Sequence, residues 1–294
     1  MRTFRPLLVL STAVVLAASP SASQAAGWTR GNMTQPPGGF ANAVAVNANA
    51  ETVVVSGNFD STNGCGYFLY ESLGGVGAWT QVGDRGFVGF MDAGGIGIET
   101  DPGVIWGVDG CGEIYRWNGS VWANSSFGKA PASSITASAL AYMTNDSGVW
   151  KGTAFGWGAF LGGAGAIQVS VSNGNTSRPE KPWYIDSSGR IFESDGNGNW
   201  IARPALPSGA FPTFIAAVQS ASTSQPRVFV VSDAQFVGKN GYKVYEWINN
   251  GPWKQVANMY AWQIAASWTA SGGFAVRTLD FNGTLFKWTC SSGC

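Results

Sequence analysis

The sequence contains no histidine and few charged residues. Among its 294 residues there is no His, and Asp, Glu, Lys and Arg together make up 12%. Because His is the usual general base and the commonest metal ligand, its absence excludes a Ser-His-Asp or Cys-His catalytic site and the usual zinc sites. The formal net charge is zero, so the basic stripe typical of nucleic-acid binding is missing. We therefore expect no metal, no cofactor and no nucleic-acid partner.

Long apolar runs are also scarce. One apolar run, Leu7 to Ala18, follows Arg2 and Arg5 and precedes small residues that continue to Ala26. This order is typical of a secretory signal peptide, so we expect residues 1–26 to be removed and the chain to be secreted, outside the cell or into a periplasm. No later run approaches the roughly 18 apolar residues that a spanning helix needs, so we expect no membrane span.

Cysteine is sparse too, with four copies. An even count in an exported chain indicates disulfides, and four cysteines allow three connectivities. Cys65 and Cys111 each lie in a Gly-Cys-Gly, in corresponding turns of two repeats, while Cys290 and Cys294 are close together at the C-terminus. We favour the pairs Cys65–Cys111 and Cys290–Cys294; the other two pairings stay open.

What the sequence does contain is a short phrase of an apolar residue, an aromatic residue and a charged residue. Its aromatics recur at intervals of 35 to 53 residues, and a period of this size is typical of propellers and solenoids. The copies are Leu69-Tyr70-Glu71, Ile114-Tyr115-Arg116, Val149-Trp150-Lys151, Ile191-Phe192-Glu193, Val244-Tyr245-Glu246 and Leu285-Phe286-Lys287.

The second copy shows what each repeat encodes. Short β-rich runs, bounded by Gly, Asn and Asp, follow one another between Gly95 and Trp122. Such runs are typical of consecutive antiparallel strands, and four of them in about 43 residues predict one propeller blade. An Asp precedes the third run of every copy, which favours a turn role over catalysis or metal binding. These residues are Asp60, Asp109, Asp146, Asp186, Asp233 and Asp280.

A tryptophan follows the phrase in the first five copies, and we interpret it as packing between blades. These residues are Trp79, Trp122, Trp157, Trp200 and Trp253. The sixth copy lacks one, but Gly27-Trp28-Thr29 at the mature N-terminus resembles Ala78-Trp79-Thr80. We therefore expect Trp28 to supply the outer strand of the last blade and to close the ring, which protects edges that could otherwise template aggregation.

The sequence thus predicts an all-β fold, a six-bladed β-propeller of four-stranded antiparallel blades, in one domain over residues 27–294. A five-bladed arrangement without the weak third copy is the alternative, although it leaves Tyr115 and Phe192 nearly two periods apart. The expected blades span roughly 33–83, 84–126, 127–163, 164–206, 207–257 and 258–294 with 27–32.

Several segments resemble the tectonin repeat. They include Gly103-Val104-Ile105-Trp106-Gly107-Val108 with Gly112 to Trp117, Pro182-Trp183-Tyr184-Ile185-Asp186 with Gly189 to Phe192, and Gly251-Pro252-Trp253. The resemblance covers nearly all of residues 27–294 and is weakest in the first and third copies. It implies a β-propeller, and it implies glycans or glycoconjugates as partners, because several tectonin-type proteins are secreted or surface lectins.

Candidate ligand residues lie where the copies differ. Three copies place a Trp directly after the charged residue, and an aromatic ring beside a charge is one way to build a shallow sugar site. The predicted ligand-binding residues are therefore Arg116, Trp117, Glu246, Trp247, Lys287 and Trp288. Packing for the Trp residues and a solvated strand face for the charges are the alternatives.

No pair of carboxylates is marked out by its spacing, as glycoside hydrolysis would require. We therefore expect a secreted, non-catalytic carbohydrate-binding propeller with several shallow sites, in which multivalency raises avidity. A protein-interaction or surface-structural propeller, with a surface protein as partner, is the first alternative. A carbohydrate-active enzyme is the second.

Overall fold

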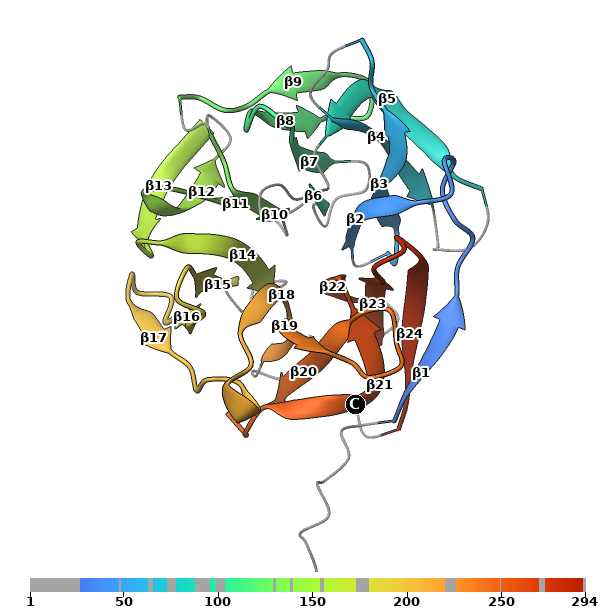
Figure 1. The fold of residues 1–294 in the computed structure, drawn as a ribbon. Coiled ribbons are helices and arrows are strands. Elements are labelled where there is room, and N and C mark those ends of the chain that lie inside the picture. Colours follow the sequence, from blue (N-terminus) through green and yellow to red (C-terminus); the bar gives the residue numbers. More distant parts are fainter. Residues whose placement is uncertain are drawn as a thin grey trace, which may run out of the picture.

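The computed structural model is a six-bladed β-propeller (Figure 1). It describes residues 27–47, 49–62, 66–72, 78–87, 96–98, 104–128, 131–137, 140–153, 156–172, 180–219, 226–248, 250–269 and 273–292. The expected signal peptide, Cys65 and Cys294 lie outside these residues. Neither described cysteine, Cys111 or Cys290, is a free thiol, and the two favoured pairings stay predictions.

Every blade is a four-stranded antiparallel sheet, and in blades 1 to 5 the strands follow in chain order from the centre outward (Figure 1). Blade 1 contains β2 (Ala41–Val46), β3 (Thr52–Phe59), β4 (Tyr67–Ser72) and β5 (Thr80–Phe87). Blade 2 contains β6 (Ile96–Ile98), β7 (Ile105–Val108), β8 (Ile114–Trp117) and β9 (Trp122–Asn124). Blade 3 contains β10 (Ser134–Ala137), β11 (Ala141–Asn145), β12 (Gly148–Thr153) and β13 (Gly156–Gly162).

The second half of the ring repeats this plan. Blade 4 contains β14 (Ala166–Ser172), β15 (Lys181–Asp186), β16 (Ile191–Ser194) and β17 (Trp200–Ala202). Blade 5 contains β18 (Pro212–Gln219), β19 (Pro226–Gln235), β20 (Tyr242–Ile248) and β21 (Lys254–Ala261). Blade 6 contains β22 (Gln263–Trp268), β23 (Phe274–Leu279), β24 (Leu285–Ser292) and β1 (Gly27–Asn32).

The six-bladed prediction is confirmed, and the weak third copy forms a full blade of its own, so the five-bladed alternative is wrong. Strands β5 and β21 continue to Phe87 and Ala261, past residues 83 and 257 where the sequence placed the blade ends. Among the described residues the only helical segment is a 3-10 turn at Pro207–Gly209, and no helix there is long and apolar enough to span a membrane.

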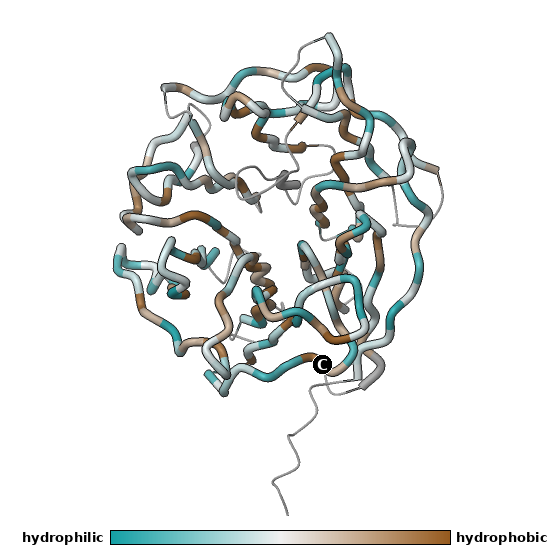
Figure 2. The backbone as a smooth tube through the Cα atoms, viewed as in Figure 1, coloured by the Kyte–Doolittle hydropathy of each residue, from teal (hydrophilic) through white to brown (hydrophobic). Residues whose placement is uncertain are grey.

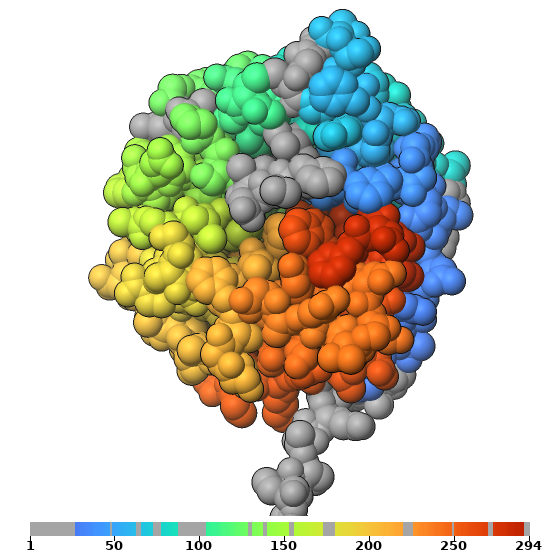
Figure 3. All heavy atoms as spheres, in the orientation of Figure 1, coloured from blue at the N-terminus to red at the C-terminus, as the bar shows by residue number. Residues whose placement is uncertain are grey.

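The two ends of the chain close the ring in blade 6, as expected from Trp28. Strand β1 pairs antiparallel with β24, and Arg30 lies opposite Trp288. The N-terminal segment accordingly lies against the C-terminal one in Figures 1 and 3. Because the first and last strands share one sheet, the outer edge of β24 is paired rather than open.

The repeated phrase is the third strand of each blade. Its apolar residue is fully buried in all six copies, and its aromatic packs toward the preceding blade. Strand residues alternate between the two faces of a sheet, so the charged residue points toward the following blade. Hydrophobic residues gather along the strands, while the most hydrophilic stretches lie on the rim and in the turns (Figure 2).

Tryptophans in, or directly before, the outer strands tie each blade to the one before it. The indole N–H of Trp122 donates to the Val82 carbonyl of blade 1 at 3.1 Å, and Trp157, Trp200 and Trp253 repeat this bond at the next three junctions. Their acceptors are the carbonyls of Ser125, Leu161 and Pro204, at 2.8, 2.7 and 2.8 Å. Trp79 donates to the Thr34 carbonyl at 3.2 Å. The packing role predicted for these residues is confirmed.

The Asp residues before the third strand mostly cap turns, as expected. In blade 2 the Asp109 Oδ1 accepts the backbone N–H groups of Cys111 and Glu113, both at 2.9 Å. Gly112 completes this turn with a φ of +77°, which favours glycine because an added Cβ would be strained. Asp186 and Asp280 build the same Asp-x-x-Gly turn in blades 4 and 6.

One of the six assignments is wrong, and a second residue, Asp146, lies in its turn without capping it. In blade 3 the turn is capped by Asn145, whose Oδ1 accepts from the Ser147 N–H at 3.0 Å, and Asp146 is the exposed residue beside it. In blade 5 Asp233 lies inside the long strand β19 and accepts the Phe211 N–H at 2.8 Å. The turn that follows β19 lies at residues 236–241, so Asp233 is left inside the strand.

We predict that removing the closing strand destabilises the whole ring. A chain that begins at Thr34, and therefore lacks residues 27–33, loses the β1–β24 pairing and exposes the edge of β24. Its melting temperature, measured by calorimetry, should fall sharply relative to a chain that begins at Gly27. An unchanged melting temperature would contradict the closure.

We also predict that the indole bonds contribute measurably to stability. Trp157→Phe removes one N–H donor from a buried carbonyl, at a cost of about 1–3 kcal/mol. The melting temperature should fall by roughly 2–4 °C per kcal/mol. Trp268→Phe is the control, because the Trp268 ring packs on Phe274 of its own blade at 4.7 Å between centroids; an equal fall in both variants would argue against the bond.

Candidate functional site

Two of the three tryptophans predicted to bind sugar are buried. Trp247 is 1% exposed and packs edge-on against Trp183 of blade 4, with ring centroids 5.3 Å apart. Trp288 is 2% exposed and donates its indole N–H to Thr278 Oγ1 at 2.8 Å. Neither ring has a free face for a ligand, so the expectation that they are exposed is wrong; both belong to the blade core.

The third, Trp117, is half-buried. Its ring packs on Trp122 with centroids 5.3 Å apart, and it faces Gly83 of blade 1. Gly83 has a φ of +66°, and a Cβ there would collide with Trp117 and Trp122. The position therefore requires glycine, and the half-buried Trp117 ring serves the packing of blade 1 on blade 2.

The charged residues of the predicted site also lie in the junctions. Glu246 is 1% exposed and forms an ion pair with Arg227 at 3.0 Å. Burial raises the pKa of Glu246, while the Arg227 charge opposes that rise. Arg116 lies 5.7 Å from the Trp106 ring, and Lys287 lies opposite Gly31 in the β1–β24 pair. Because Glu246 is buried, the alternative that the charged residues lie on a solvated strand face is wrong for Glu246.

The six predicted residues do not come together, and strand geometry explains why. Arg116 and Trp117 are consecutive residues of β8, and consecutive strand residues point to opposite faces. Arg116 therefore faces blade 3 while Trp117 faces blade 1, and the same holds for the other two pairs. A Trp directly after a charged residue cannot share one cleft with it on a regular strand.

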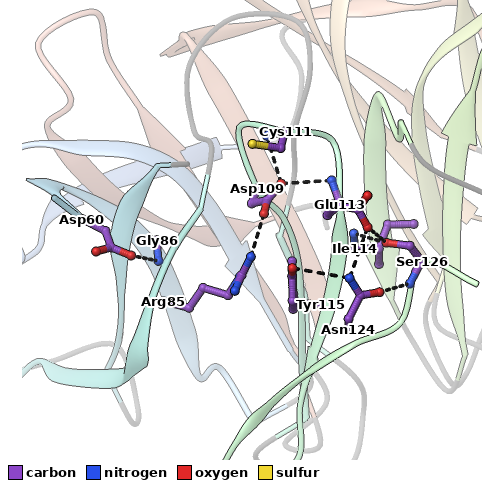
Figure 4. Close-up of polar contacts among 10 residues, drawn as sticks. All are labelled: Asp60, Arg85, Gly86, Asp109, Cys111, Glu113, Ile114, Tyr115, Asn124 and Ser126. Carbon is purple, nitrogen blue, oxygen red and sulfur yellow. Dashed lines mark hydrogen bonds and ion pairs between the residues drawn. The ribbon is translucent and has the colours of Figure 1, made fainter. Parts of the chain in front are cut away.

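A different cluster of polar side chains lies where blade 1 meets blade 2 (Figure 4). Arg85 of β5 reaches across to blade 2, where its guanidinium carbon lies 3.5 Å from the centre of the Tyr115 ring. Its Nη2 forms an ion pair with Asp109 Oδ2 at 3.0 Å, and its side chain is 25% exposed. A guanidinium held between an aromatic ring and a carboxylate has little freedom to move.

The Asp109 carboxylate is held in place by its turn. Its Oδ1 accepts two backbone N–H groups, which leaves Oδ2 to Arg85. The Asp-x-x-Gly turn thus fixes the anion, and the anion fixes the arginine from the neighbouring blade. Asp109 of the turn and the central aromatic Tyr115 therefore determine where the Arg85 charge lies.

Glu113, Asn124 and Ser126 add hydrogen-bonding groups beside the arginine. Ser126 Oγ donates to Glu113 Oε2 at 2.5 Å, and Asn124 Nδ2 lies 3.2 Å from the same oxygen. The Ser126 bond, followed by the Asn124 bond, lowers the pKa of Glu113 below its usual value, and the Arg85 charge contributes in the same direction. Glu113 is therefore an ionised hydrogen-bond acceptor at neutral pH.

We refer to Arg85, Asp109, Glu113, Tyr115 and Asn124 as the Arg85 site. It offers unused guanidinium N–H donors, a carboxylate acceptor and a carboxamide at the surface. Within the described residues no group of three or more Cys, Asp or Glu could hold a metal ion, and the Arg85 site has two carboxylates that are already bonded. This arrangement suits a neutral, hydroxyl-rich ligand.

Sequence reasoning missed Arg85 because it lies outside the repeated phrase. It occurs six residues after Trp79, in a stretch of β5 that is displaced by a register shift. The ring that it stacks on belongs to the next repeat. The only signal was Tyr115 itself, whose repeated position indicated core packing rather than a partner across the junction.

No family model matches the chain, and no curated relative matches it. Among solved structures, the SapL1 lectin in complex with alpha methyl fucoside superposes with a TM-score of 0.57 at 18% identity, over 85% of this chain and 93% of that one. The Aleuria aurantia lectin in complex with Fucalpha1-6GlcNAc superposes with a TM-score of 0.52 at 17% identity, over 85% and 91%.

An enzyme is similar as well. The GH74 xyloglucanase from Xanthomonas campestris superposes with a TM-score of 0.56 at 13% identity, over 84% of this chain. The match spans 36% of the xyloglucanase chain, so this protein corresponds to about a third of that enzyme. At these identities the likeness establishes the β-propeller fold, which lectins and enzymes share.

We predict that the low pKa of Glu113 depends on Ser126. Ser126→Ala removes the hydrogen bond that contributes most to it, so the pKa of Glu113 should rise toward its usual value. Asn124→Ala should raise it less. Side-chain carbon NMR during a pH titration measures both, and a larger rise in Asn124→Ala than in Ser126→Ala would contradict the proposed network.

Proposed function

We propose that this chain is a non-catalytic carbohydrate-binding protein that acts outside the cell and binds a saccharide at the Arg85 site. The observation that carries the proposal is Arg85, whose guanidinium lies over the Tyr115 ring and pairs with Asp109 while its side chain stays 25% exposed. Placement outside the cell rests on the signal peptide expected in residues 1–26.

The chemistry of the Arg85 site matches that of a sugar. A pyranose presents neighbouring hydroxyls, each both a donor and an acceptor. The planar guanidinium can donate to two adjacent oxygens at once, and the ionised Glu113 can accept from a third hydroxyl. Because Tyr115 and Asp109 already hold Arg85 in place, little side-chain entropy is lost on binding.

Comparison with the lectins supports the same class of ligand. SapL1 and the Aleuria aurantia lectin have this fold and are described in complex with fucose-containing saccharides. Fucosides are therefore the first ligands to test on this chain. The fold also occurs in a xyloglucanase, so an enzymatic function needs its own argument.

The carboxylates at the Arg85 site favour binding over hydrolysis. Glycoside hydrolysis needs one carboxyl group with a raised pKa as proton donor and a second across the scissile bond. At the Arg85 site the pKa of Glu113 is lowered and Asp109 is bonded to Arg85. Glu193 and Glu246 are buried beside cations. We therefore propose no catalytic step.

We predict that the folded protein binds saccharides and that Arg85 is required. A panel of methyl glycosides (α-fucoside, α-mannoside, β-galactoside, β-glucoside and N-acetyl-β-glucosaminide) is titrated by calorimetry. Arg85→Ala should weaken binding to the Arg85 site by about tenfold or more, since hydrogen bonds to charged groups contribute about 1.5–3 kcal/mol. Arg85→Lys should also weaken it, because the planar fork is lost.

Lys254→Ala is the matched control, because it removes an exposed cation from the outer strand β21 of blade 5. It should leave saccharide binding unchanged. Failure of the folded wild-type protein to bind any member of the panel would overturn the proposal. Release of reducing ends from polysaccharide would show an enzyme, and glycan-independent capture of one protein would favour the interaction module.

A further inference from the structure

The arrangement of Arg85 on Tyr115 recurs at two other junctions. In blade 4 the Arg190 guanidinium carbon lies 5.4 Å from the centre of the Phe192 ring, and in blade 6 the Arg30 carbon lies 4.8 Å from that of Phe286. Tyr115, Phe192 and Phe286 are the central aromatics of three copies of the repeated phrase. Alternate blades thus carry an arginine at an equivalent place.

The three arginines come from different parts of the repeat. Arg85 lies in the outer strand of the preceding blade, Arg190 lies in the hairpin before β16, and Arg30 lies in the closing strand β1. An alignment of the repeats therefore would not pair them. Their guanidinium groups nevertheless meet the same ring position, so the local chemistry is equivalent although the chain positions are not.

The anion beside the guanidinium is also equivalent in blades 2 and 4. Arg190 Nη2 and Nε both lie 2.7 Å from Asp186 Oδ2. This oxygen corresponds to Asp109 Oδ2 of blade 2, which pairs with Arg85. Burial alone would raise the pKa of Asp186, but hydrogen bonds from the Arg190 backbone and from Ser188 outweigh it and lower that pKa. Asp186 is therefore ionised at neutral pH and holds the arginine.

Blade 6 uses a tyrosine in place of the aspartate. Arg30 donates a hydrogen bond to the hydroxyl of Tyr260, which comes from the outer strand of blade 5. The Tyr260 ring lies 5.7 Å from the Arg30 guanidinium carbon and 6.1 Å from the Phe286 ring. The guanidinium is thus held between aromatics of two blades, again at a junction.

All three arginine side chains reach the surface. The side chain of Arg85 is 25% exposed and that of Arg190 is 69% exposed, and Arg30 is an exposed residue. A guanidinium has five N–H donors, and the bonds described occupy only some of them. Each arginine therefore keeps donors for an outside ligand while its ring and its anchoring oxygen fix its direction.

We propose that the protein has three saccharide-binding sites, at the junctions of blades 1 and 2, 3 and 4, and 5 and 6. This inference rests on the proposed function and adds the number of binding sites per chain. Because blades 2, 4 and 6 alternate around the ring (Figure 1), the three sites are distributed around it. Three such sites raise avidity for a glycan-covered surface by about 10² or more without stronger single contacts.

The test is a calorimetric titration of the full chain with the same panel of methyl glycosides, followed by binding to beads that carry the same sugar densely. Wild-type protein should bind about three equivalents per chain, one at each of the three arginines. Arg85→Ala, Arg190→Ala and Arg30→Ala should each remove one equivalent, and the triple variant should bind none. Affinity for the beads should fall about 10²-fold once two sites are removed.

Each variant is compared with Lys254→Ala by its melting temperature. Where an alanine variant unfolds, the corresponding Arg→Lys variant is tested in its place. Lysine keeps the positive charge but lacks the planar guanidinium that donates two parallel hydrogen bonds. One equivalent, sensitive to Arg85 alone, would overturn the three-site proposal while the proposed function stands. No binding of any glycoside would overturn both. More than three equivalents would also contradict the three-site proposal.

Discussion

The structure depends on one interaction, the indole N–H of an outer-strand tryptophan that bonds to a carbonyl of the preceding blade. A four-stranded blade has two apolar faces and cannot bury either of them alone. The indole both covers apolar surface and satisfies a carbonyl that the junction would otherwise bury without a partner. Trp122, Trp157 and Trp200 repeat this bond at successive junctions, which sets the spacing between blades.

The seam between blades 5 and 6 departs from this rule. Trp28 makes no such bond of ordinary geometry; its indole N–H faces the Glu246 carboxylate and favours its ionised form. Arg227 pairs with Glu246 and lies 4.6 Å from the Phe274 ring. A buried ion pair gains less than its Coulomb energy suggests, because both charges lose water.

The fold could be predicted from the sequence because its blades come from a repeated sequence phrase. The site could not be predicted, because its arginines are not part of that repeat. The phrase around Tyr115 occurs six times, so periodicity revealed the blades, and Trp28 matched the missing sixth outer strand. Arg85, Arg190 and Arg30 hold no common place in the repeat. Their relation exists only after folding brings each to a central aromatic.

The error over Trp247 and Trp288 has a simple origin. Adjacency to a charged residue suggested a shared cleft, although neighbouring strand residues face opposite ways.

The division between a uniform interior and variable junctions explains how such a propeller can carry binding sites. The buried phrase and the indole bonds hold the blades, so the residues above them can differ without loss of the ring. We propose that ligand binds at these junctions, on Arg85, Arg190 and Arg30. A crystal structure with the tightest-binding methyl glycoside tests it directly. We expect the sugar hydroxyls within hydrogen-bond distance of the Arg85 guanidinium and Glu113; a sugar bound away from Arg85, Arg190 and Arg30 would contradict the account.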